Sequence, residues 1–113
     1  MILKAREKKA VNEFASLLVQ KMSRQLRELV LFGSRARGNY RRDSDIDVLV
    51  LVNREDLKTW EAIQSLSALV SLKFDLVLSA LVMDEKRYKT HCQLKTLLFR
   101  NISRDGIRLW KKK

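Results

Sequence analysis

The chain has 113 residues, of which 46% are hydrophobic and 33% charged, a size that fits one compact domain over residues 1–113. Its longest uncharged apolar run, residues 48–52, is far shorter than the roughly 20 residues of a membrane span, the start has no signal-peptide core, and one cysteine excludes an internal disulfide. We therefore expect a soluble, cytoplasmic protein. The net charge of +11 predicts an anionic partner, which charge alone cannot identify as nucleic acid, a nucleotide or an acidic protein surface.

The first half of the chain is expected to form a helix and two strands. Apolar residues recur every three or four positions over residues 4–27, which predicts an amphipathic helix. Residues 28–33 are a short apolar run that ends in glycine, as is typical of a buried strand. The polar segment 34–44 has room for one helical turn, and residues 45–52 predict a second strand that is apolar on both faces after an acidic start.

The second half continues this alternation of helices and strands. Asn53 or Asp56 can cap a helix that carries an apolar stripe, and residues 74–82 predict a third strand. Asp84 can cap a last long helix, and Gly106 breaks the chain before a short strand. The predicted fold class is α/β (α+β), with a small mixed sheet of about four strands packed against helices.

Two aspartates at the start of the second strand are candidate metal ligands. On a strand Asp45 and Asp47 project to one side, about 7 Å apart, while Ile46 faces the opposite layer. Carboxylates so placed can hold a divalent cation, and magnesium would compensate their mutual repulsion. The alternative is that both face solvent or pair with Arg41 and Arg42, which the D-x-D pattern by itself leaves open.

Gly33 and Ser34 follow the first predicted strand directly. A turn there would present backbone N–H groups and the serine hydroxyl to an anion, and glycine lets a phosphate approach the backbone closely. Beside a D-x-D strand, this pair predicts a phosphate cradle opposite a metal site. Metal-assisted transfer of a nucleoside phosphate requires that arrangement.

A third carboxylate is expected on a neighbouring strand. Asp75 lies inside an otherwise apolar segment, where an isolated charge would be costly. We predict it to be a metal ligand and a candidate base for the attacking hydroxyl. The alternative is an exposed strand end paired with Lys73 or an arginine.

The joint motif G-S-x10-D-x-D, residues 33–47, resembles that of the nucleotidyltransferase superfamily related to DNA polymerase β. It is more closely similar to the minimal nucleotidyltransferases of prokaryotes. The resemblance implies a minimal polymerase β-like palm in which Asp45, Asp47 and Asp75 hold two magnesium ions. It also implies that Gly33 and Ser34 bind the triphosphate of ATP.

The resemblance implies a protein partner as well. Many such proteins are antitoxins that transfer AMP from ATP to a tyrosine of a HEPN-domain ribonuclease toxin. Arg35, Arg37, Arg41 and Arg42 are placed to contact phosphates or an acidic partner, and Arg37 is the favoured candidate for nucleotide binding. The alternative function is that of a non-catalytic antitoxin or RNA-binding protein that acts by contact alone.

Overall fold

The computed structural model describes residues 3–37 and 45–113, with the side chains of Ser34 and Arg37 outside this description. The strands form one sheet in the order β3-β2-β1-β4. The elements in chain order are α1 (Ala5–Met22), β1 (Leu26–Phe32), α2 (Ser34–Arg37), β2 (Ile46–Val52), α3 (Leu57–Phe74), β3 (Leu78–Asp84), α4 (Glu85–Leu94), α5 (Leu97–Asp105) and β4 (Ile107–Lys111).

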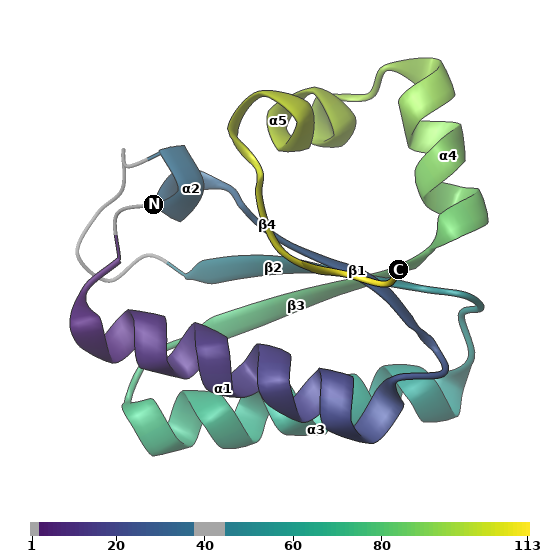
Figure 1. Ribbon diagram of the computed structural model, residues 1–113. Helices are drawn as coiled ribbons and strands as arrows, with labels where there is room; N and C mark the ends of the chain where they lie inside the picture. Colours follow the sequence, from purple (N-terminus) through teal and green to yellow (C-terminus); the bar gives the residue numbers. More distant parts are fainter. Residues whose placement is uncertain (1–2, 38–44) are drawn as a thin grey trace.

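The sheet is mixed, as the sequence predicts. β1 runs antiparallel to both of its neighbours, β2 and β4, whereas β2 and β3 are parallel. Helices α1 and α3 cover one face, and α4 and α5 lie over the other (Figure 1). In the described part of the chain, no helix is long and apolar enough to cross a membrane.

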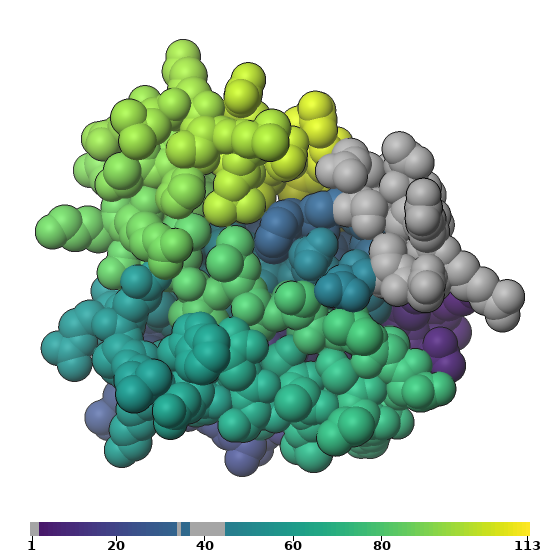
Figure 2. Space-filling model, turned by 180° about the vertical axis from the view of Figure 1, so that it is seen from behind, coloured from purple at the N-terminus to yellow at the C-terminus, as the bar shows by residue number. Residues whose placement is uncertain are grey.

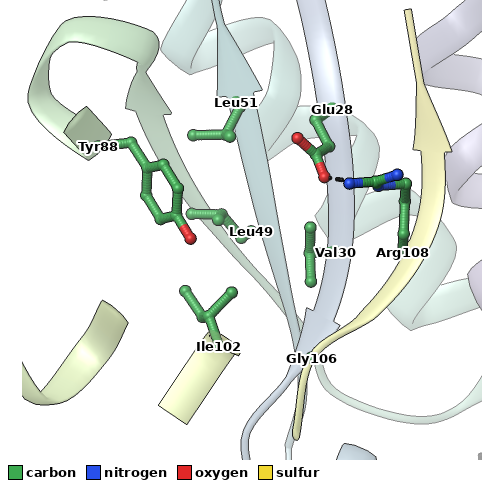
Figure 3. A pocket seen from close by; sticks show the side chains of 8 residues that line it. All are labelled: Glu28, Val30, Leu49, Leu51, Tyr88, Ile102, Gly106 and Arg108. Atoms are coloured by element: carbon green, nitrogen blue, oxygen red, sulfur yellow. Dashed lines mark hydrogen bonds and ion pairs between the residues drawn. The ribbon is translucent and has the colours of Figure 1, made fainter. Parts of the chain in front are cut away.

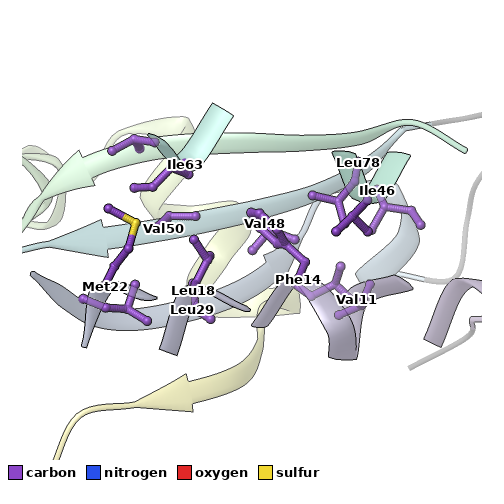
Figure 4. Close-up of a cluster of buried hydrophobic side chains, with 14 of the residues drawn as sticks. Val11, Phe14, Leu18, Met22, Leu29, Ile46, Val48, Val50, Ile63 and Leu78 are labelled. Atoms are coloured by element: carbon purple, nitrogen blue, oxygen red, sulfur yellow. The ribbon is translucent and has the colours of Figure 1, made fainter. Parts of the chain in front are cut away.

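The main hydrophobic core lies between the sheet and helices α1 and α3 (Figure 4). Alternate residues of β2 point into it, beginning with Ile46, because successive side chains of a strand face opposite sides. The fully or almost fully buried members include Val11, Phe14, Leu18, Leu29, Ile46, Val48, Val50, Ile63 and Leu78. Asp45 and Asp47, the neighbours of Ile46, therefore belong to the other face.

The face under α4 and α5 is less completely filled. Its smaller core is made of Val30, Leu49, Leu51, Met83 and Ile102, and α4 contributes no buried residue. Seen from behind, the molecule has a hollow between its yellow-green and teal parts, with blue and teal residues at its floor (Figure 2). This open face is where a ligand can reach the sheet.

Two of the predicted element boundaries differ from the structure near the first strand. The helix ends at Met22 rather than at residue 27, and β1 begins at Leu26. Leu26 lies four positions after Met22 and so continues the helical spacing, but it pairs with Val52 in the sheet. No proline or glycine lies between the helix and the strand. The connection is a short turn in which the Gln25 N–H donates a hydrogen bond to the Met22 carbonyl.

The predicted third strand, residues 74–82, is wrong at its start. α3 continues to Phe74, and β3 spans Leu78–Asp84. The last predicted helix is divided into α4 and α5 by Lys95, which has a left-handed conformation with φ of 51°. The predicted caps are confirmed at Asp56, whose side chain accepts a hydrogen bond from Thr59 N–H, and at Asp84, which does the same for Arg87.

Candidate active site

The centre of the site is the contact between the end of β1 and the start of β2. Phe32, the last residue of β1, pairs with Asp47. Gly33 follows with φ of 78°, and a Cβ atom added to it would lie 2.5 Å from Oδ2 of Asp47. This position requires glycine for two independent reasons, its positive φ and its closeness to the carboxylate.

Helix α2 begins immediately after this glycine, at Ser34. The N–H groups of a first helical turn have no partner within the helix itself, which is the general reason that anions bind at such positions. The prediction of one helical turn after the first strand is confirmed. Ser34 and Arg37 are the first and last residues of α2, and their side chains lie outside the described part of the structure, as do Arg41 and Arg42.

Asp47 lies on the open face of the sheet, at the end of β2 nearest to Gly33, and Asp45 directly precedes this strand. Asp45 is exposed and Asp47 half-buried. Burial, and secondly the charge of Asp45, raise the pKa of Asp47 above its ordinary value. A bound cation would offset both effects, since it would replace lost hydration and neutralise the repulsion. The oxygen donors that magnesium prefers are thus present.

The predicted third carboxylate does not lie on the neighbouring strand. Asp75 is the residue that ends α3, in a left-handed conformation with φ of 52°. It is exposed and lines a hollow between α1 and α3, together with Arg6 and Arg35. Within residues 3–37 and 45–113, no three His, Cys, Asp or Glu side chains are grouped so as to hold a metal ion.

The prediction that Asp75 lies on the strand next to β2 is therefore wrong, and the reason is local. Residues 74–82 read as one apolar run, and periodicity cannot separate the end of a buried helix from the start of a buried strand. Aspartate also tolerates the left-handed conformation better than most residues, which suits it to a helix end. Asp75 serves the turn between α3 and β3.

Ser79 is the residue that the parallel pairing of β2 and β3 places opposite Asp47. Paired residues of neighbouring strands share a face, and Ser79 is exposed. Its hydroxyl is therefore a polar group on the same face of the sheet as Asp47. Sequence reasoning missed Ser79 because the strand begins four residues later than predicted.

Arg35 has a different environment from the one predicted. It was expected to contact phosphates or an acidic partner, but its side chain is buried and forms an ion pair with Glu7 of α1. Glu7 was missed, although its position gives a signal. It lies four residues before Val11 and seven before Phe14, so it falls on the buried stripe of α1.

Comparison with known proteins supports the resemblance seen in the motif. A family model described as a nucleotidyltransferase domain matches residues 11–108. The chain is 30% identical over 100 residues to the Methanocaldococcus jannaschii protein named "Putative protein adenylyltransferase MJ0604". The alignment covers 88% of this chain and 94% of that relative.

Solved structures share the fold. One is a toxin-antitoxin complex with AMP-PNP, with a TM-score of 0.59 and 23% identity over 90% of this chain and 73% of that one. Another is a complex of tri-AMPylated Shewanella oneidensis HEPN toxin with an MNT antitoxin, with a TM-score of 0.54 and 21% identity, covering 93% and 72% of the two chains.

The mixed sheet and the family match define the class, which is that of the nucleotidyltransferases. More particularly, the chain belongs to the nucleotidyltransferase domain family, and its fold is similar to that of the solved structure described as a "putative minimal nucleotidyltransferase", with a TM-score of 0.53. The predicted family and fold class are confirmed.

Proposed function

We propose that this nucleotidyltransferase is the antitoxin of a HEPN-domain toxin and transfers AMP from ATP to a tyrosine hydroxyl of that partner. In the reaction the tyrosine oxygen bonds to the α-phosphorus of ATP. The bond from that phosphorus to the bridging oxygen breaks, pyrophosphate leaves with the electron pair, and the hydroxyl proton passes to water. The names of the matched relative and of the matched complexes support this choice of donor and acceptor.

The observation that carries the proposal is the contact of Gly33 with the Asp47 carboxylate. It joins the turn that leads into α2 to the two aspartates, so a phosphate chain at α2 would lie beside both carboxylates. The N–H groups of the first turn of α2 are proposed to bind the β- and γ-phosphates, together with Ser34 and Arg37.

Asp45 and Asp47 are proposed to hold magnesium, with two ions expected from the family resemblance. Magnesium in such sites is commonly bound by one or two carboxylates together with substrate phosphates, so these two aspartates suffice without Asp75. When bound, the metal would neutralise charge that develops on the departing pyrophosphate. Because Asp47 lies next to the turn at Gly33, a metal held by the two carboxylates would lie close to phosphates bound at that turn.

The experiment is to incubate the protein with ATP, magnesium and the product of the neighbouring gene, and then to weigh that product. We expect it to gain the mass of AMP on a tyrosine. Asp45→Asn combined with Asp47→Asn should abolish the gain. Asp75→Asn is the matched control and should retain it, because asparagine also accepts the left-handed conformation at the end of α3.

The contact-only alternative is tested with the same variants in cells that express the toxin. If the Asp45 and Asp47 double variant protects these cells as well as the wild-type protein does, contact suffices and the enzymatic proposal fails. The enzymatic proposal also fails if the wild-type protein adds no mass to the partner. If Asp75→Asn folds normally but loses transfer activity, Asp75 is a functional residue of the site.

A further inference from the structure

A cavity of about 200 Å³ lies between the sheet and helices α4 and α5. Figure 3 shows how its lining side chains converge from β1, β2, β4 and the two helices. The lining residues are Glu28, Val30, Leu49, Leu51, Tyr88, Ile102, Gly106 and Arg108. We refer to this cavity as the α4–α5 slot.

The α4–α5 slot lies next to the two aspartates on the same face of the sheet. Leu49 and Leu51 follow Asp47 at two and four residues along β2 and so point to its side, at about 7 and 13 Å. On β1, Val30 pairs with Leu49 and Glu28 with Leu51. A molecule anchored at Asp47 and extended along the strands therefore enters the slot.

The size and walls of the slot fit one flat ring. A cavity of about 150 Å³ with apolar walls is enough for benzene, whereas pockets for whole drug-sized ligands take about 300 Å³ or more. Val30, Leu49 and Leu51 form an apolar floor, and Ile102 faces them from α5 (Figure 3). A single aromatic ring system matches this space, but a nucleotide or a peptide segment does not.

Polar groups stand at the rim of the slot. Glu28 and Arg108 form an ion pair of 2.9 Å, in which the arginine side chain is 59% exposed and the glutamate 20%. The Tyr88 hydroxyl is directed toward Leu49 and Ile102 rather than toward Leu51 (Figure 3). Burial, and then the neighbouring Cys92 and Glu28, raise the pKa of Tyr88, so its phenol stays protonated and can donate a hydrogen bond.

We propose that the α4–α5 slot binds the nucleobase of the nucleotide, a purine that carries an exocyclic amino group. The inference rests on the proposed function, because the phosphates at Gly33 and Asp47 anchor the molecule. The ribose spans the distance from Asp47 to Leu49, and the ring lies on the apolar floor. At the rim Glu28 accepts from the amino group, and Arg108 donates to a ring nitrogen, the kind of pairing by which these side chains recognise base edges.

The position of the slot distinguishes the nucleobase from the acceptor side chain. An acceptor hydroxyl must come within bonding distance of the α-phosphorus, opposite the departing pyrophosphate. It therefore has to lie beside Asp47, whereas the slot begins about two residues further along β2. The part of the substrate that lies away from the reacting atoms, on the far side of the sugar, is the base.

The test measures, by calorimetry in the presence of magnesium, the affinities for ATP and for inorganic tripolyphosphate, which has no base. Ile102→Phe narrows the slot and Arg108→Gln removes a rim donor. Each should weaken ATP binding about tenfold, the effect of one good hydrogen bond or ring contact, and leave tripolyphosphate binding unchanged. The control is Arg87→Gln, since Arg87 forms a similar exposed pair with Glu55 at 3.0 Å outside the slot. It should change neither affinity.

Several outcomes would overturn the inference. One is ATP affinity that neither slot variant changes, and another is an equal loss for ATP and tripolyphosphate. Normal ATP affinity with reduced modification of the partner would assign the slot to the acceptor instead. If the wild-type protein binds neither ATP nor tripolyphosphate, the proposed function itself fails. Because Arg108 is exposed, Arg108→Gln keeps the test decisive even if Ile102→Phe does not fold.

Discussion

Glu7 of α1 and Arg35 of α2 form an ion pair of 2.5 Å, with side chains that are only 6% and 4% exposed. The carboxylate of Glu7 also accepts a hydrogen bond from the backbone N–H of Lys4, at the start of α1. Arg35 lies two residues after Gly33. The pair therefore fastens the first turn after the glycine to the N-terminal helix, on the side of the sheet away from Asp47.

Removing the acid of this pair should be strongly destabilising. In Glu7→Ala the guanidinium of Arg35 loses a buried partner, and we expect a loss of about 3 kcal/mol in the free energy of unfolding by urea. Glu13→Ala is the control, because its 2.7 Å pair with Lys73 is exposed and should change stability by less than about 1 kcal/mol. Equal effects of the two substitutions would show that burial of the Glu7 pair has no energetic consequence.

Gly33→Ala should impair both folding and nucleotide transfer. A non-glycine residue in the left-handed conformation costs roughly 1–2 kcal/mol, and the added methyl group would displace the Asp47 carboxylate. Combining it with Asp47→Ala relieves the second effect. The double variant should therefore recover part of the thermal stability but no transfer activity, whereas additive losses of stability would contradict the contact.

Ser79 offers a gain-of-function test of the site. Because it lies opposite Asp47 in the parallel pair, Ser79→Asp adds a third carboxylate, and magnesium affinity should rise roughly tenfold, since affinity increases with the number of charged ligands. Calorimetric titration with magnesium measures this change. Ser79→Asn is the matched control without the charge, and equal affinities of the two variants would place the metal elsewhere.

The free energy of unfolding should depend on pH through the carboxylate of Asp56. Hydrogen bonds from Thr59, first from its backbone N–H, hold the pKa of Asp56 below the ordinary value of 3.8. Because the pKa of Asp56 is lower in the folded state, its stabilising contribution is present above pH 3.8 and is lost as the pH falls through the pKa of the folded state. Asp56→Asn should lack this component in urea unfolding followed from neutral to strongly acidic pH. Parallel pH profiles of the two proteins would refute the assignment.

Local sequence patterns predicted the part of the site that lies within one short segment of the chain, from Gly33 to the start of β2. Alternation along β2 sends Ile46 into the core and the two aspartates to the other face, which follows from strand geometry alone. The glycine before α2 was likewise recognisable, because its position after an apolar run requires a turn. These features depend on residues that are close together in the chain.

Features that depend on distant segments were not accessible in this way. The register of β3 against β2 decides that Ser79, and not Asp75, lies opposite Asp47. An apolar run does not contain that information, because α3 can continue into it without a change in hydrophobicity. The Glu7–Arg35 pair joins residues 28 positions apart, and only the packing of α1 against the sheet brings them together.

The antiparallel pairing of β1 with β4 has a consequence during synthesis on the ribosome. Glu28 and Arg108 are separated by 80 positions, so one edge of β1 has no strand partner until β4 has been translated. At about 5–20 residues per second, this interval lasts roughly 4–16 seconds. An uncovered edge of an apolar strand invites pairing with other chains, so the nascent protein should depend on chaperones until its fourth strand emerges.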